Sequence, residues 1–212
     1  MIGKRDSVGC LFIGDALGRK GNDGLTWAHD IPGVELRAFR CADARGLWDR
    51  LQCALQALRA ERGICPIMAV GTGCAAALAL ACQLPVDKLV LIDPARPARP
   101  FVATDRAAGV DDARAQRALR RLAGFARRNL PLCVSDMLIV DHGPAEGEDA
   151  LRRAYGNPAN CRTRRLAVSG KWDKELYTIR EFEVKQAISR FLQPADAPKP
   201  LAENSEMCII YG

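Results

Sequence analysis

The residues best placed to do chemistry lie in a short turn between two apolar runs. Gly71-Thr72-Gly73-Cys74 follows the run Ile64–Val70 and opens the alanine-rich run Cys74–Cys82. This pattern favours a buried strand, a tight turn and a helix. A thiol at the N-terminus of a helix can have a lowered pKa and act as a nucleophile, which makes Cys74 a candidate. Small cysteines are also common in protein cores, and the sequence favours that second interpretation.

The same turn fits the fingerprint of dinucleotide-binding proteins. Gly71, Gly73 and Ala76 match the pattern G-x-G-x-x-G/A, and Asp93 stands twenty residues after Gly73. In such proteins the pyrophosphate lies at the helix N-terminus and the acidic residue binds the ribose. Arg96 follows closely enough to meet a 2′-phosphate. The fingerprint usually opens the first strand-helix-strand unit, whereas here two strand-like runs precede it. NAD(P) binding is therefore an alternative and not the first hypothesis.

Few other residues suggest catalysis or metal binding. The chain has two histidines, His29 and His142, so an imidazole base would have to be one of them. Neither lies in a catalytic motif, and such a histidine is most often an ordinary polar residue. The nine cysteines are scattered, with no C-x-x-C pair and no Cys/His spacing typical of zinc. We expect reduced thiols, no metal, no cofactor and a cytoplasmic protein.

Positive charge is concentrated in one part of the chain. The net charge is +6, and nine arginines lie between Arg96 and Arg128, where only three aspartates occur. Such a run usually forms a solvated helix face, and an anion-binding lid is the alternative. The charge favours a small anionic molecule or a protein partner. It does not identify nucleic acid, so we expect no nucleic-acid partner.

No membrane span is expected either. The segment Gly63–Val86 has no charged residue and is long enough to cross a bilayer. Pro66, the glycine turn and Pro85 interrupt it, as expected of a strand, a turn and a short helix.

Strand-like and helix-like runs alternate along most of the chain. The expected strands are Val8–Ile13, Val34–Phe39, Ile64–Val70, Lys88–Ile92, Met137–Val140 and Arg165–Val168. The expected helices are one capped by Asp43 and ending near Gly63, then Cys74–Cys82, Val110–Leu130, Glu148–Tyr155 and Thr178–Leu192. Strands that are apolar throughout predict an α/β fold with a mostly parallel sheet and helices on both faces. We expect one three-layer domain over residues 1–193, with a small helical lid over 95–132 and a C-terminal tail over 194–212.

This order of elements resembles the α/β-hydrolase superfamily. The resemblance covers nearly all of residues 8–192 and starts at what would be the family's third strand. The family's nucleophile elbow reads G-x-S-x-G, or G-x-S-x-A in variants. On this chain the pattern puts Gly71 first, Gly73 at the nucleophile and Ala75 last. The resemblance therefore implies an elbow whose nucleophilic side chain is replaced by hydrogen.

The resemblance also implies where the oxyanion hole would lie. Its backbone N–H groups would belong to Cys74 and to Asp15, which follows Gly14. A carboxylate at Asp15 would repel the negative charge that develops there.

The remaining catalytic positions of the family are only partly kept. The catalytic acid would be Glu146, in the segment Gly143-Pro144-Ala145-Glu146. The histidine position falls in Ser169–Asp173, which contains no histidine. Lys171 in that segment would pair with Glu146 or remain a solvated surface lysine.

Three functions are compatible with these patterns. The first is an α/β-hydrolase-like pseudoenzyme without Ser-His-acid catalysis, which binds a small, anionic molecule or a protein partner. The second is an active ester or thioester hydrolase with Cys74 as nucleophile, His142 as base and Glu146 as the orienting acid. The third is an NAD(P)-binding protein of the Rossmann type that uses Gly71, Gly73 and Asp93. The substrate and the oligomeric state do not follow from the sequence.

Overall fold

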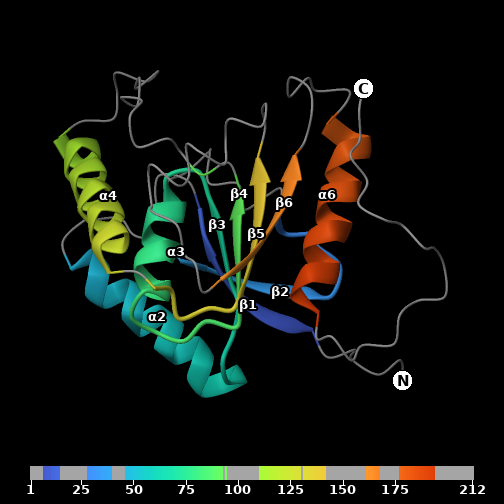
Figure 1. Ribbon diagram of the computed structural model, residues 1–212, viewed down its shortest axis with the longest axis horizontal. Coiled ribbons are helices and arrows are strands. Elements are labelled where there is room, and N and C mark those ends of the chain that lie inside the picture. Colours follow the sequence, from blue (N-terminus) through green and yellow to red (C-terminus); the bar gives the residue numbers. More distant parts are fainter. Residues whose placement is uncertain are drawn as a thin grey trace.

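Strands and helices alternate along the chain, as predicted (Figure 1). The computed structural model describes residues 7–14, 28–39, 46–92, 94, 110–129, 131–141, 161–167 and 177–193. The strands in these ranges are β1 (Val8–Ile13), β2 (Val34–Phe39), β3 (Ile67–Val70), β4 (Lys88–Ile92), β5 (Asp136–Asp141) and β6 (Arg162–Ala167). The helices are α2 (Leu47–Arg62), α3 (Gly73–Ala81), α4 (Val110–Arg128) and α6 (Tyr177–Leu192).

The described strands form one parallel sheet with the order β2-β1-β3-β4-β5-β6. In it β1 lies between β2 and β3, with Leu11 opposite both Arg37 and Ile67. The chain thus passes from β1 outward to β2 and then returns to the other side of β1 to form β3. This reversal creates a topological switch point at the carboxyl ends of β1 and β3. The prediction of a parallel sheet is confirmed.

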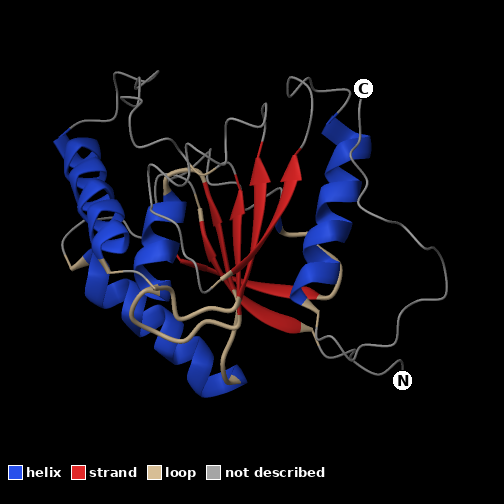
Figure 2. Ribbon diagram, in the orientation of Figure 1, coloured by secondary structure: helices blue, strands red, loops and turns tan. Residues whose placement is uncertain are grey.

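Helices cover both faces of the sheet (Figure 2). On one face lie α2, α3 and α4, and α6 lies on the other. Successive residues of β1 supply the two cores in turn, Leu11 and Ile13 the first, Cys10 and Phe12 the second. Both faces of the strand are removed from water, which explains why its sequence is apolar throughout. The predicted three-layer α/β architecture is confirmed.

The first core is built around α3. All residues of this helix, from Gly73 to Ala81, are buried. A helix that is apolar all round is typical of a position enclosed by other elements. Its small side chains allow the sheet, α2 and α4 to pack closely around it.

One side of α2 completes this core. Its buried residues are Leu47, Leu51, Leu55 and Leu58, at the three- and four-residue spacing of one helix face. The helix begins after Gly46, which has φ 62° and makes no side-chain cap. The expected cap, Asp43, lies outside the described residues.

Three strands begin at residues other than those predicted, and one of them, β5, begins only one residue earlier, at Asp136. In β3 the start is Ile67, since Ile64 is 58% exposed and Pro66 has no N–H to donate to a neighbouring strand. The edge strand β6 starts at Arg162, three residues earlier than predicted. Its first residues are polar and exposed, so a search for apolar runs does not find them. The helix expected over 148–155 lies outside the described residues.

The buried side of α6 does not include all of its apolar residues. Phe182 is apolar, but its side chain is 60% exposed. The residues of α6 that are buried are Val184, Lys185, Ile188, Ser189, Phe191 and Leu192. The polar Ser189 is accommodated because its hydroxyl donates to the carbonyl of Pro32 at 2.6 Å.

The carboxyl end of α6 is attached to the start of β4. Lys88 Nζ donates to the carbonyl oxygens of Leu192 at 3.4 Å and of Gln193 at 2.6 Å. The same ammonium lies 5.8 Å from the centroid of the Phe191 ring. Carbonyls at the end of a helix lack helical partners, and a cation there also complements the helix dipole. Lys88 therefore holds α6 on the sheet.

The basic helix α4 lies beside α3 in the same helical layer. Leu119, Ala123 and Ala126 are buried in the first core. Phe125 packs against Trp48 of α2, with ring centroids 5.7 Å apart. Residues 95–109 of the expected lid and the tail 194–212 lie outside the described residues, so the lid and the domain limits remain predictions.

The described ranges contain neither a membrane-spanning helix nor a cluster of metal-binding side chains. No helix in them has both the length and the apolar composition needed to cross a membrane. The same ranges hold no group of three or more His, Cys, Asp or Glu side chains able to bind a metal ion.

Candidate functional site

The topological switch point brings two glycine-containing segments together. Gly14 follows β1 and Gly71 follows β3, and these strands are neighbours with Ile13 opposite Ala69. In open parallel sheets, ligands bind in the crevice outside the carboxyl ends of the strands at such a point. The turn from β3 to α3, which sequence analysis singled out, lies at this position.

The β3–α3 turn consists of Gly71 and Thr72. Gly71 has φ 55°, in the left-handed region that glycine adopts without steric cost. Its N–H donates to the carbonyl of Ile92 at 2.9 Å. Thr72 has ordinary helical angles, φ −65° and ψ −22°, and α3 begins at Gly73. The unusual backbone conformation of the turn is therefore at Gly71.

Gly73 leaves no space for a side chain. A Cβ atom built on it would lie 2.6 Å from the carbonyl oxygens of both Gly14 and Ile13. It would also lie 3.1 Å from Ile13 Cγ2. The obstructing oxygens belong to the backbone, which cannot rotate away as a flexible side chain would. The close approach of backbone to backbone therefore requires glycine at this position.

Cys74 faces the interior of the protein. Its side chain is fully buried, and Sγ donates to the carbonyl oxygens of Ala69 at 3.5 Å and of Ile92 at 3.7 Å. These acceptors lie on β3 and β4, so the thiol is directed at the sheet. A nucleophile must reach its substrate. The position of Cys74 is that of a core cysteine and counts against its role as a nucleophile.

His29 lies at the amino ends of the strands, opposite to the β3–α3 turn. It precedes β2, whose amino end is marked by the hydrogen bond from Val8 N–H to the carbonyl of Gly33. Its side chain is 78% exposed and lies 3.9 Å from Asp30. The β3–α3 turn is at the carboxyl ends of the strands, so His29 is not a base for this site.

Comparisons with known proteins identify the fold. No family model and no curated protein sequence matches the chain. Among solved structures, it is similar to Est1E from Butyrivibrio proteoclasticus, at 12% identity and TM-score 0.56, over 89% of this chain and 88% of that one. It is similar to an alpha-beta serine hydrolase homologue from Coxiella burnetii, at 17% identity and TM-score 0.52, over 89% and 86% of the two chains. A third match, to the metagenome-derived lipolytic enzymes LipS and LipT, has 14% identity and TM-score 0.51, over 86% and 94%.

The chain has an α/β-hydrolase-like fold. At identities this low the likeness concerns architecture, and the reaction has to be argued from the site itself.

The α/β-hydrolase-like fold allows the turn to be compared with a nucleophile elbow. In the family the nucleophile sits on the sharp, strained turn between strand and helix. The sequence motif placed Gly73 there, but the residue with the unusual conformation is Gly71, and Gly73 already belongs to α3. The geometry favours Gly71 as the counterpart of the nucleophile. With either alignment, the position carries no side chain.

The first N–H donor of the expected oxyanion hole, that of Cys74, already has a partner within the protein. The N–H of Cys74 donates to the carbonyl of Gly71 at 3.2 Å, within the turn itself. An oxyanion hole needs N–H groups that point at the substrate. The second expected donor, Asp15, lies outside the described residues.

The other predicted site residues cannot be compared with this geometry. Asp93, His142, Glu146 and Lys171 all lie outside the described residues, so their assigned roles remain predictions. This includes the pairing of Lys171 with Glu146.

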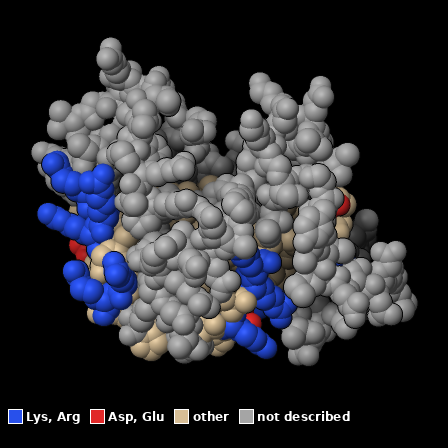
Figure 3. Space-filling model, turned by 45° about the horizontal axis from the view of Figure 1, so that its top comes forward, with Lys and Arg blue, Asp and Glu red and all other residues tan. Residues whose placement is uncertain are grey.

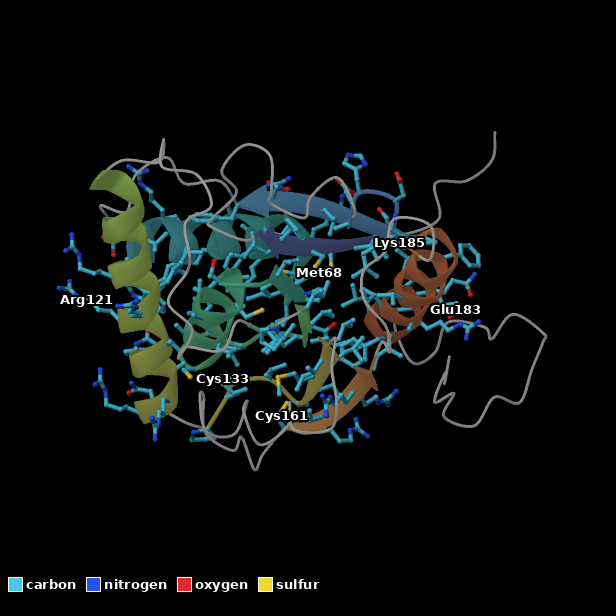
Figure 4. All side chains as sticks on the ribbon, turned by 90° about the horizontal axis from the view of Figure 1, so that it is seen from above. Met68, Arg121, Cys133, Cys161, Glu183 and Lys185 are labelled. Atoms are coloured by element: carbon cyan, nitrogen blue, oxygen red, sulfur yellow. The ribbon has the colours of Figure 1, made fainter. Side chains whose placement is uncertain are left out.

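Burial raises the pKa of several of the described thiols. Burial raises the pKa of Cys10, and the neighbouring Cys65 thiol adds to the increase. Burial likewise raises the pKa of Cys82 and of Cys161 to about 11. Cys133, in contrast, is exposed on the surface (Figure 4). Buried thiols with raised pKa values are typical of structural cysteines.

Proposed function

We propose that this chain is an α/β-hydrolase-like protein without Ser-His-acid catalysis, which binds a small anionic molecule at the carboxyl edge of its sheet. The observation that carries the proposal is the absence of a side chain at the β3–α3 turn. Serine chemistry needs a hydroxyl at the elbow, and neither Gly71 nor Gly73 supplies one. At Gly73 the carbonyls of Gly14 and Ile13 leave no room for one.

The binding part of the proposal rests on topology and charge. The switch point between β1 and β3 is where open parallel sheets bind ligands. The chain carries a net charge of +6, which favours an anion over a cation. A catalytically inactive hydrolase-like fold retains this edge as a place for a ligand.

The two alternative functions have less support. The thioester-hydrolase hypothesis needs an accessible Cys74, and this thiol is fully buried with two backbone acceptors. The NAD(P) hypothesis needs pyrophosphate at the start of α3. There the backbone of Gly14 and Ile13 lies close against Gly73, which leaves little room for a pyrophosphate. Neither arrangement favours the chemistry in question.

Activity assays test the loss of catalysis. We expect the purified protein to hydrolyse p-nitrophenyl acetate and a butyryl thioester no faster than its Cys74→Ala variant, and not to react with a fluorophosphonate probe. A Thr72→Val variant is a useful addition, since Thr72 is the only hydroxyl residue of the turn. Saturable turnover that disappears in either variant would contradict the proposal.

Thermal shift measurements test the binding. A ligand present at 100 times its Kd stabilises the folded state by about 2.7 kcal/mol. For a domain of this size that raises Tm by about 5–10 °C. The probes are phosphate, pyrophosphate, butyrate and NADP⁺ at millimolar concentration. A shift confined to NADP⁺ would support the dinucleotide alternative, and no shift with any probe would count against an anion site.

A further inference from the structure

The exposed side chains of α4 between residues 117 and 128 are all arginines. Arg117, Arg120, Arg121, Arg127 and Arg128 are all exposed, and we call them the arginine face. No acidic residue occurs between Arg117 and Arg128. The basic side chains gather over α4 on one side of the molecule (Figure 3), and Arg121 points away from the body of the protein (Figure 4). The prediction that arginines lie opposite the apolar side of this helix is confirmed for these residues.

Three arginines elsewhere on the described surface are paired with acids. Arg37 contacts Glu61 and Arg62 contacts Glu35, each at 2.7 Å. On the edge strand, Arg162 pairs with Asp136 at 2.8 Å. No member of the arginine face forms an ion pair within the described ranges. In this respect α4 differs from α2, β2 and β6, each of which has an arginine paired with an acid.

The local structure explains only part of the arginine face. Arg127 and Arg128 lie in the last turn of α4, where cations complement the helix dipole. Arg117, Arg120 and Arg121 lie further inside the helix, where like charges three and four residues apart destabilise it. These three arginines have no stabilising role within the described part of the protein.

The helix presents these charges on a fixed support. Leu119, Ala123 and Ala126 are buried on its opposite side, and Phe125 packs against Trp48. Arg117, Arg120 and Arg121 are thus held three and four residues apart, and neighbours at this spacing are about 5–6 Å apart on a helix surface. Arg127 and Arg128 follow about two helical turns further along the same helix.

The chemistry of the face favours a protein over other polyanions. Single-stranded nucleic acids need exposed aromatic rings for stacking, and amphipathic membrane helices need exposed large apolar residues. Among the described residues, the exposed large apolar side chains are Ile64 and Phe182, and neither is on α4. An acidic helix needs only guanidinium groups, which bind carboxylates through two parallel hydrogen bonds. Its carboxylates recur at the same three- and four-residue spacing.

We propose that the arginine face of α4 is a docking surface for an acidic α-helix of a partner protein. This inference is independent of the ligand site at the β3–α3 turn, because it concerns the outer side of a different helix. Either one can therefore fail while the other holds.

Fluorescence anisotropy tests the proposal. The probe is a labelled, alanine-rich peptide of roughly 20 residues, long enough to be helical, with glutamates at three- and four-residue spacing. It is titrated with the full chain and with two variants that each lose three positive charges. The face variant is Arg117→Gln, Arg120→Gln and Arg121→Gln. The matched control carries Arg62→Gln, Arg164→Gln and Arg190→Gln, which are exposed positions on other elements.

We expect the face variant to bind the peptide on the order of tenfold more weakly, as three exposed ion pairs are lost. The control should bind as the unchanged chain does, and added salt should weaken all binding. Circular dichroism should show both variants folded, since none of the substituted side chains is buried. Equal weakening in both variants, or no binding at low salt, would overturn the proposal. So would tighter binding of duplex DNA or phosphatidylserine vesicles through the same three arginines.

Discussion

Replacing Gly73 by alanine tests how closely β1 and α3 approach each other at the switch point. The new Cβ would lie 2.6 Å from the carbonyl oxygens of Gly14 and Ile13, whereas ordinary contact starts at 3.4 Å. The two elements would have to separate by about 0.8 Å. The strand cannot yield easily, because β1 is hydrogen-bonded to β2 on one side and to β3 on the other.

The expected magnitude combines two opposing effects. Overpacking of a well-packed region costs about 1–3 kcal/mol, and the upper part of that range applies where the obstacle is backbone. Alanine is favoured over glycine in a helix by up to about 1 kcal/mol. We therefore expect Gly73→Ala to lower the free energy of unfolding by about 1–2 kcal/mol, equivalent to about 2–8 °C in Tm.

Gly124 provides a matched control for this measurement. It lies within α4, and a Cβ built on it meets nothing within 4 Å. Gly124→Ala should therefore raise the free energy of unfolding by up to about 1 kcal/mol, with the sign opposite to that of Gly73→Ala. Urea titrations followed by far-UV circular dichroism measure both variants, and equal m-values would show that the unfolding reactions are comparable.

One result would refute the reasoning. If Gly73→Ala were as stable as the unchanged chain while Gly124→Ala were stabilised, the close approach between β1 and α3 would not exist. A side chain could then be mounted at Gly73, and the steric part of the argument against a nucleophile would be lost.

Three further measurements test other parts of the structure. Iodoacetamide should modify the exposed Cys133 in the native protein, but Cys74 only after unfolding. Peptide mass spectrometry would detect both modifications, and rapid labelling of Cys74 in the native protein would contradict its burial. Lys88→Met should lower the free energy of unfolding by about 1–2 kcal/mol, measured in urea, because the carbonyls at the end of α6 lose a charged donor. The hydrogen bond from Arg37 lowers the pKa of Glu61, so Arg37→Gln should raise that pKa in an NMR titration. The lowered pKa contributes stability above the ordinary carboxylate pKa, and this contribution disappears as the pH falls through the folded pKa, so the two proteins should converge in acid.

The sequence predicts the buried strands well because the residues that end each strand follow it directly in the chain. The runs that form β1 and β4 are apolar, and Gly14 and Asp93-Pro94 close them, so the predicted bounds agree with the structure. A strand that is buried on both faces does not alternate between apolar and polar residues. This continuous apolar pattern indicates a parallel sheet before the pairing of the strands is known. The parallel register then fixes which strand ends lie together.

Features that depend on tertiary packing are not predicted. The edge strand β6 begins with exposed polar residues, so its pairing with β5 cannot be read from hydrophobicity. Which glycine of the turn is left-handed depends on where α3 starts, and the structure has this conformation at Gly71 and the start of α3 at Gly73. The direction of the Cys74 thiol depends on how α3 is rotated against the sheet.

The two glycines of the turn restrict where a nucleophilic side chain could be introduced. A serine at Gly73 would meet the backbone of β1, so a substitution there would destabilise the fold before it produced a nucleophile. A serine at Gly71 would have to accept a left-handed backbone conformation, a strain that hydrolases tolerate at the elbow. If Gly71 is taken as the counterpart of the nucleophile, the first oxyanion donor would be the N–H of Thr72, the residue that follows it. The N–H of Cys74, the donor expected from the sequence motif, is used within the turn. The packing at Gly73 and the hydrogen bonds of the turn make it a structural element, which supports the proposal of binding over catalysis at this edge.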